Sequence, residues 1–228
     1  MKEKSRVLII GASGRIGKEI YKIFNVESNK NSFDIFGTFH NNPVNEFEKI
    51  DITNIDSVKN VINKIKPNII IHTAGLIHPL TCEENKELAW EINVIGTKNI
   101  LDCSREFKSK LVYISTDYVF DGKNNPYDEL DQPNPLNYYG QTKFESEKLI
   151  SSLDDYLIIR TAWINDVEKN SSSFIMQLIN SLKNDKSFIV PYDQFGSPTI
   201  PSNLSEIIYE LIQQNKKGIF HVTGTTYI

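Results

Sequence analysis

The chain has 228 residues, of which 39% are hydrophobic and 24% charged, a composition typical of a globular protein. The formal net charge is −4 and there is no basic cluster, so nucleic acid is not an expected partner. The sequence has no long apolar run, so we expect no membrane span, no secretory signal and a cytoplasmic location. Its two cysteines, Cys82 and Cys103, fit neither a disulfide framework nor a metal site, and no metal is expected.

The N-terminal segment carries a nucleotide-binding pattern. Residues 6–10 form an aliphatic run that predicts a buried strand, and an amphipathic helix is predicted directly after the glycines that follow. Glycines allow a tight turn with close backbone approach, and the helix N-terminus offers unpaired N–H groups to a pyrophosphate. The spacing is G-x-x-G-x-x-G rather than G-x-G-x-x-G, and an ordinary strand-to-helix turn is the alternative. We predict a dinucleotide site formed by Gly11, Ser13, Gly14, Arg15, Ile16 and Gly17.

The second predicted strand, residues 33–38, bears on the choice of cofactor. Sites that prefer NAD usually place an acidic residue at the end of this strand. Here Phe39, His40 and two asparagines follow it, and Asp34 lies too early. The absence of a carboxylate favours NADPH over NADH, with Arg15 or His40 as the phosphate contact.

Strand and helix patterns alternate along the rest of the chain. Further strands are predicted at 69–71, 111–114 and 156–159, and helices at 55–65, 87–105 and from Tyr139 to about 151. This alternation predicts a doubly wound parallel α/β sheet of the Rossmann type, with ligands at the carboxyl ends of its strands. We assign it to residues 1–160. Helices near 174–182 and 204–211, a strand at 188–190 and a loop at 191–201 are expected in a small substrate-binding lobe, residues 161–228.

Tyr139 and Lys143 are a candidate catalytic pair. They are four residues apart, so on a helix they share one face. An ammonium beside a phenol lowers the pKa of the phenol, and a phenol of lowered pKa exchanges protons with a carbonyl or alcohol oxygen. Thr116 follows the strand at 111–114 and would donate a hydrogen bond to the same oxygen. Alone, such a pair also arises by chance on many helices.

A longer signature extends this pair. It comprises STDYVFDG at 115–122, Pro126, Tyr127, Glu129, Asp131, Pro133, Pro135, Asn137, YGQTK at 139–143, RTAW at 160–163 and DQFGSPT at 193–199. With these residues the chain resembles the extended short-chain dehydrogenase/reductase superfamily, and within it the dTDP-4-dehydrorhamnose reductase family. The resemblance covers nearly the whole chain.

The resemblance implies a function and assigns residues to it. Tyr139 would protonate the C4 oxygen of a nucleotide-linked 4-keto-6-deoxy sugar that NAD(P)H reduces, with Thr116 and Lys143 completing the catalytic set. Lys143 would also hold the ribose. The remaining assignments are Asp51 and Ile52 beside the adenine, Ala74 and Gly75 beside the nicotinamide, and Asp117, Tyr118 and Trp163 facing the sugar. A homodimer is left open.

Several residues have simpler interpretations. A structural or solvent role is expected for His72 and His78, a helix hydrogen bond explains Asn93 as well as a site role does, and Tyr138 is expected to pack. Residues 83–84, both glutamate, are expected to mark a helix start.

Two departures from the family pattern leave alternatives open. The chain ends where family members continue into further helices, so we expect a shortened lobe. Residues 77–82 lack an acidic residue that is common there, so the sugar is open as well. A non-catalytic, cofactor-binding regulatory subunit similar to the methionine adenosyltransferase β-subunit is one alternative, and a nucleotide-sugar epimerase is another.

Overall fold

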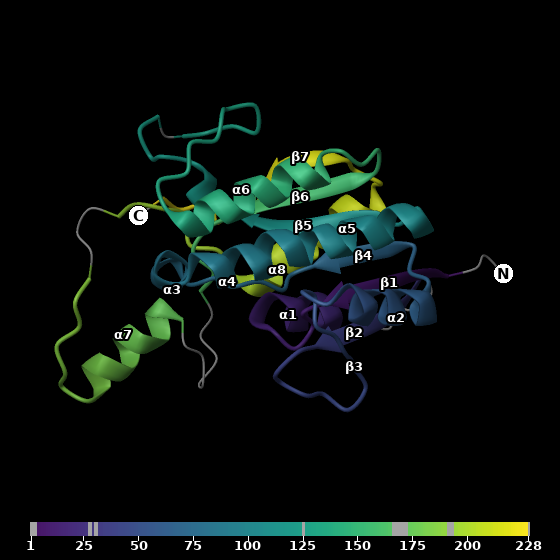
Figure 1. Ribbon diagram of the computed structural model, residues 1–228. Coiled ribbons are helices and arrows are strands. Elements are labelled where there is room, and N and C mark those ends of the chain that lie inside the picture. Colours follow the sequence, from purple (N-terminus) through teal and green to yellow (C-terminus); the bar gives the residue numbers. More distant parts are fainter. Residues whose placement is uncertain are drawn as a thin grey trace.

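A central β-sheet lies between two layers of helices in the computed structural model (Figure 1). The structure describes residues 4–26, 29, 32–124, 126–165, 173–190 and 194–227. Residues 191–193, which open the predicted loop and include Asp193 of the signature, lie outside these ranges. The strand predicted at 188–190 is wrong, because these described residues have no regular secondary structure.

The sheet has seven parallel strands in the order β3-β2-β1-β4-β5-β6-β7. This topology confirms the predicted doubly wound α/β fold. The strand order reverses between β1 and β4, and in open α/β sheets such a switch point is where ligands bind. The strands are β1 (Ser5–Ile10), β2 (Phe33–Phe39), β3 (Glu48–Lys49), β4 (Ile69–His72), β5 (Lys110–Thr116), β6 (Tyr156–Thr161) and β7 (Gly218–His221).

The helices cover both faces of the sheet. One face carries α1 (Arg15–Phe24) and α8 (Pro201–Gln213); the other carries α2 (Ile55–Ile65), α5 (Gly96–Phe107) and α6 (Tyr138–Ile150) (Figure 1). The shorter or more peripheral elements are α3 (Pro79–Glu84), α4 (Lys86–Trp90), the π-helical turn η1 (Glu91–Ile95), the 3-10 turn η2 (Asp117–Val119) and α7 (Phe174–Lys183).

The core follows from the alternation of side chains along buried parallel strands. In β1, Val7 and Ile9 belong to the apolar cluster under α1 and α8, whereas Leu8 and Ile10 belong to the cluster under α2, α5 and α6. Leu204 and Ile208 of α8 pack in the same cluster as Ile20 and Phe24 of α1. Both α8 and β7 follow residue 160, yet α8 packs in the main core and β7 joins the sheet. The predicted boundary between a nucleotide-binding domain and a substrate-binding lobe at residue 160 stays a prediction.

Two helix predictions need correction. The single helix predicted over 87–105 is divided into α4, η1 and α5, because five residues around Asn93 adopt a π-helical turn. The pattern of apolar residues does not reveal this turn. Glu83 and Glu84 lie at the end of α3 and not at a helix start. Glu83 nonetheless serves a helix N-terminus, since its carboxylate accepts a hydrogen bond from the backbone N–H of Tyr138 at 2.5 Å.

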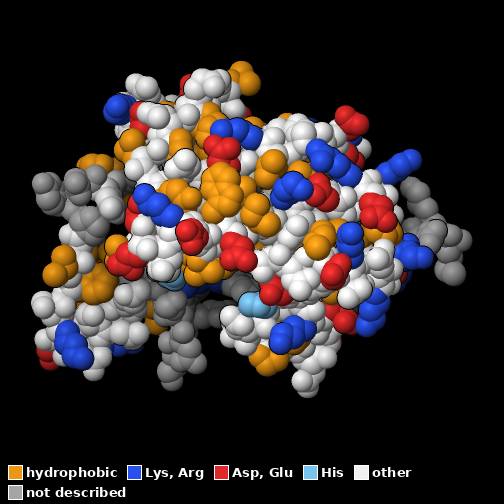
Figure 2. All heavy atoms as spheres, in the orientation of Figure 1, with side chains coloured by type: hydrophobic (Ala, Val, Ile, Leu, Met, Phe, Trp, Pro, Cys, Tyr) orange, Lys and Arg blue, Asp and Glu red, His pale blue; other side chains and the backbone are white. Residues whose placement is uncertain are grey.

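The surface agrees with the composition. On the face that carries α5 and α6, acidic and basic side chains are interspersed, with apolar side chains between them (Figure 2). None of the helices in the described ranges has the length and apolar character needed to cross a membrane. The same ranges contain no group of three or more His, Cys, Asp and Glu residues able to hold a metal ion. Cys82 and Cys103 are both free and buried.

Candidate active site

A cavity of about 1360 Å³ opens at the carboxyl ends of the strands. It is large enough for a dinucleotide with a second ligand beside it. Every residue predicted to contact cofactor or substrate lines this one cavity: Gly11, Ser13, Gly14, Arg15, Ile16, Gly17, His40, Asp51, Ile52, Ala74, Gly75, Thr116, Asp117, Tyr118, Tyr139, Lys143 and Trp163.

The glycine loop forms one wall of the cavity. Gly11 has a φ of +89°, and a Cβ there would lie 2.9 Å from the backbone nitrogen of Ala74. A Cβ on Gly17 would lie 2.2 Å from the carbonyl oxygen of Gly11, so α1 can approach the strand only without a side chain at this position. Gly14 is the N-cap of α1, where no side chain caps the helix and the first turn has no acidic residue. A helix N-terminus without such a cap can bind an anion through its first N–H groups, and residues of this turn line the cavity.

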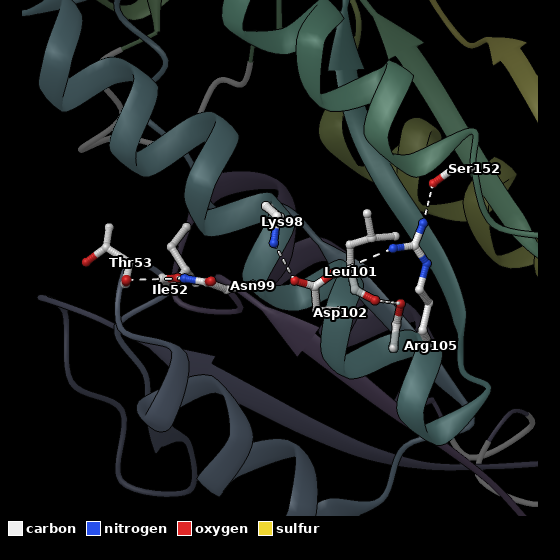
Figure 3. A network of polar contacts seen from close by, with 9 residues as sticks. Ile52, Thr53, Lys98, Asn99, Leu101, Asp102, Arg105 and Ser152 are labelled. Carbon is white, nitrogen blue, oxygen red and sulfur yellow. Dashed lines mark hydrogen bonds and ion pairs between the residues drawn. The ribbon is translucent and has the colours of Figure 1, made fainter.

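The segment after β3 also lines the cavity. Asp51 accepts hydrogen bonds from the backbone and hydroxyl of Thr53, at 3.0 and 2.7 Å. These bonds, the hydroxyl first, together with the nearby His40 hold the pKa of Asp51 below its usual value. From α5, the side-chain amide of Asn99 donates to the carbonyl oxygens of Ile52 and Thr53 at 2.9 and 3.2 Å (Figure 3). This segment is thus fixed to the helix layer.

A second set of contacts in the same view fixes α5 itself. Lys98 pairs with Asp102 at 2.7 Å, and Arg105 donates to the hydroxyl of Ser152, just after α6, at 2.5 Å (Figure 3). The first pair lies within α5, and the second contact connects α5, which carries Asn99, to the end of α6, which carries Tyr139.

The segment after β6 closes the cavity on its other side. Arg15 donates to the carbonyl oxygen of Ile164 at 3.2 Å, which joins the glycine loop to this segment. Trp163 adopts a left-handed backbone with a φ of +39°, and its carbonyl oxygen accepts from the backbone of Thr199 at 3.0 Å. The Trp163 ring lies so close to Gly196 that a Cβ on Gly196 would be 3.1 Å from it. Residues 196–199 thus contact both the backbone and the indole of Trp163.

Tyr139 and Lys143 lie one turn apart on α6, as predicted, but their electrostatics differ from the prediction. Burial raises the pKa of Tyr139, and Lys143 is not among the groups that act on it. The ammonium of Lys143 instead donates to the carbonyl oxygen of Ile114 at 2.7 Å and lies 4.0 Å from the centre of the Tyr113 ring. Burial lowers the pKa of Lys143 to about 7. The predicted lowering of the Tyr139 pKa by Lys143 is therefore wrong for this state of the protein, because burial of the phenol raises its pKa.

Thr116 bonds the two residues that follow it in the cavity wall, Asp117 and Tyr118. Its hydroxyl accepts from the backbone of Tyr118 and donates to the carboxylate of Asp117, both at 3.2 Å. Hydrogen bonding to Thr116 also acts to lower the pKa of Tyr139, which places the hydroxyl beside the phenol. Burial raises the pKa of Asp117. The rings of Tyr118 and Tyr139 meet edge to face, with centroids 5.9 Å apart.

The remaining candidates occupy supporting positions. Asn93 in the π turn binds both backbone groups of Leu76, at 2.8 and 3.0 Å, and the hydroxyl of Thr142 at 2.9 Å. It thereby joins the loop after β4 to α6. His72 is buried against Thr97 at 3.1 Å, and burial lowers its pKa to about 3, which fits a neutral structural residue.

Tyr138 lies outside the cavity lining and has the Lys86 ammonium 5.2 Å from its ring centre, as a packing residue would. His78 lines the cavity as the N-cap of α3.

Comparison with known proteins identifies the family of this chain. The model of the family described as RmlD substrate binding domain matches residues 5–228. The chain belongs to this family.

Relatives and solved structures extend over nearly all of the chain. A methionine adenosyltransferase 2 subunit beta from Xenopus tropicalis is 32% identical over 227 residues, which cover 96% of this chain and 67% of the relative. A dTDP-4-dehydrorhamnose reductase from Aggregatibacter actinomycetemcomitans is 30% identical over 228 residues, covering 96% and 74%. The crystal structure of dTDP-4-dehydrorhamnose reductase from Bacillus anthracis in complex with NADP superposes with a TM-score of 0.87 at 37% identity, covering 99% and 76%.

Proposed function

We propose that this chain is an NAD(P)H-dependent reductase of the 4-keto group of a nucleotide-activated 6-deoxyhexose. The observation that carries the proposal is the convergence of Thr116, Tyr139 and Lys143 on the cavity that also contains the glycine loop. The similarity to dTDP-4-dehydrorhamnose reductases, one of them crystallised with NADP, supports the same chemistry.

The cavity fits a dinucleotide. The uncapped N-terminus of α1 would bind the pyrophosphate, with Ser13, Gly14 and Gly17 leaving room for it. Asp51 and Ile52 would flank the adenine, and Ala74 and Gly75 the nicotinamide. His40 and Arg15 line the cavity, and no carboxylate stands at the end of β2, which favours NADPH. When bound, NAD(P)H supplies the hydride.

Tyr139 would supply the proton. Because burial raises its pKa, the phenol is protonated at neutral pH, which is the state that a carbonyl reduction requires of its acid. The Thr116 hydroxyl beside it would donate to the same carbonyl oxygen. One hydrogen bond of the Lys143 ammonium goes to Ile114, and its other N–H groups would hold the ribose hydroxyls.

Asp117, Tyr118 and Trp163 would bind the sugar. All three line the cavity: Asp117 and Tyr118 directly follow β5, and Trp163 lies just after β6. The carboxyl group would hydrogen-bond the hydroxyls of a deoxysugar, and the indole would pack against its apolar face.

The test is consumption of NADPH and NADH with dTDP-4-keto-6-deoxy-L-mannose, by wild type, Tyr139→Phe and Tyr138→Phe. We expect turnover by wild type and by Tyr138→Phe, since Tyr138 lies outside the cavity lining. Tyr139→Phe should be inactive yet bind NADPH. Equal turnover by both variants would contradict the role given to Tyr139, and a wild type inactive with this and related sugar nucleotides would contradict the reductase.

A second function has support of its own. The 32% identity to a methionine adenosyltransferase 2 subunit beta favours a regulatory subunit that binds cofactor without catalysis. Size-exclusion chromatography of the chain mixed with a methionine adenosyltransferase catalytic subunit tests it. A stoichiometric complex together with absent sugar turnover would favour this alternative over the reductase.

A further inference from the structure

A buried carboxylate lies directly behind the cavity. Glu147 follows Lys143 by one turn of α6, and its side chain is 3% exposed. One carboxylate oxygen accepts from the Ser115 hydroxyl at 2.5 Å and from Nε of Arg160 at 3.1 Å. The other accepts from Nη2 of Arg160 at 2.8 Å. Such a bidentate, buried pair fixes both side chains in one geometry.

The partners of Glu147 precede residues of the cavity. Ser115 is followed by Thr116, and Arg160 begins the RTAW segment that ends at Trp163. Ser115 and Arg160 are also register partners in β5 and β6. One carboxylate therefore connects α6 to the ends of the two strands that position the rest of the proposed catalytic and sugar-binding groups.

The pair extends to the segment after η2. Nη1 of Arg160 lies 3.4 Å from Nε2 of His221, and its guanidinium lies 5.0 Å from the centre of the Phe120 ring. Nδ1 of His221 is 3.3 Å from the carbonyl oxygen of Tyr127. Because His221 is neutral when its Nε2 accepts from Arg160, it adds no second positive charge beside the guanidinium. The backbone N–H of His221 donates to the carboxylate of Glu129 at 2.9 Å.

Glu147 also acts on the charge of Lys143. Burial lowers the pKa of Lys143 to about 7, and Glu147 is the group that opposes this effect. The Tyr113 ring of β5 and His72 of β4 also lie near the ammonium, and Tyr139 precedes Lys143 by one turn of α6. None of these three is an anion at neutral pH, since burial raises the pKa of both tyrosines and His72 is neutral.

We propose that Glu147 is a positioning residue: its carboxylate aligns the ends of β5 and β6 with α6 and places a negative charge one helical turn from Lys143. The consequence for catalysis rests on the proposed function, whereas the effect on Lys143 does not. The effect on Lys143 is tested first in the ligand-free protein, by an NMR titration of isotopically labelled lysine side chains, with Lys143→Met assigning the signal. Glu147→Gln should move the Lys143 midpoint down by about one pH unit, and Glu147→Asp should restore part of the shift.

The matched control is a second ion pair between the same two strand regions. Lys110, at the start of β5, pairs with Asp155, just before β6, at 2.8 Å, far from the cavity lining. Asp155→Asn should destabilise the fold and leave the Lys143 midpoint unchanged. If Glu147→Gln fails to fold because Arg160 is left unpaired, Glu147→Gln with Arg160→Gln removes both charges and should fold with the midpoint still lowered. A midpoint that stays at the wild-type value, or that Asp155→Asn moves equally, overturns the inference.

Binding then tests the consequence. At mildly alkaline pH, Glu147→Gln should bind NADPH about tenfold more weakly than wild type and recover towards wild type as the pH is lowered, because an ammonium with a midpoint one unit lower is tenfold less populated. Weakening that is independent of pH would overturn the charge effect. A wild type that binds no NADPH would overturn the proposed function, and the NMR result would still decide whether Glu147 controls Lys143.

Discussion

The two ends of the cavity are built in different ways. At the β1–α1 end, the site is made by backbone and by missing side chains: three glycines and an uncapped helix N-terminus. At the β5–α6–β6 end, it is made by buried polar side chains, among them Lys143, Glu147 and Arg160. The first end has little to desolvate, whereas the second must satisfy each buried charge. We expect substitutions at the first end to act through steric clashes and those at the second end to act through lost charges and hydrogen bonds.

Loss of the phenol should give the largest effect on rate. Tyr139→Phe removes the proposed proton donor, so turnover should fall by about 10²- to 10⁴-fold. The ring and its packing remain, so the thermal midpoint should change little. Steady-state kinetics beside a thermal melt measure both quantities. A variant that keeps most of its turnover would show that the proton comes from elsewhere.

The glycines provide the steric test of the first end. In Gly17→Ala the Cβ would meet the Gly11 carbonyl oxygen at 2.2 Å, and this is a backbone atom that cannot rotate away as a flexible side chain could. We expect a loss of about 1–3 kcal/mol in the free energy of unfolding, with NADPH affinity strongly reduced. Denaturant unfolding and NADPH fluorescence titrations measure these effects.

Gly14→Ala is the matched control, because its Cβ meets only the same oxygen at 3.2 Å. Its effects should be clearly smaller than those of Gly17→Ala. Equal losses in the two variants would mean that contacts with Gly11 are not what makes Gly17 necessary.

The buried lysine predicts a pH dependence for the second end. The folded pKa of Lys143, about 7, is below its unfolded value near 10.5. Between these values the unfolded chain binds more protons, so this group makes stability rise as pH rises from about 7 to about 10.5. Lys143→Met should remove that rise. Denaturant unfolding of both proteins across this range gives the difference, and parallel curves would contradict the low pKa.

Two helix caps give the smallest and most closely matched comparison. Asn54 caps α2 by accepting from the backbone of Asp56 and Ser57, and Asn137 caps α6 by accepting from Gly140. Replacement of either by Ala should cost about 1 kcal/mol of stability. Only Asn137→Ala should also reduce turnover, because α6 begins there and carries Tyr139 in its first turn. Loss of turnover in Asn54→Ala of the same size would contradict this distinction.

Much of this organisation is visible in the sequence. Aliphatic runs gave five of the strands to within two residues at each end, and their alternation with helices predicted the parallel sheet and the edge where the cavity lies. The glycine loop was predictable because glycine spacing is a local property of the backbone. The Tyr139–Lys143 pair was predictable because helical spacing alone brings the two side chains to one face.

Other features depend on the tertiary structure. No local pattern indicates the π turn at Asn93, because the hydrogen bonds that hold that side chain go to Leu76 and Thr142, which are distant in sequence. The assignment of α8 to the main core also depends on contacts made across the sheet, with α1. Sequence patterns carry no information on such partners.

What the sequence by itself determined is the fold, the cavity edge and part of the cavity lining, including Thr116, Tyr139 and Lys143. What only the tertiary structure decided is their ionisation. Tyr139 and Lys143 have the spacing expected of a pair in which the ammonium lowers the pKa of the phenol, yet burial raises the pKa of one and lowers that of the other. Spacing along a helix is fixed by local geometry, whereas desolvation depends on every segment packed around the group. The contacts of Glu147 with Ser115 and Arg160 likewise exist only because β5, β6 and α6 pack against one another.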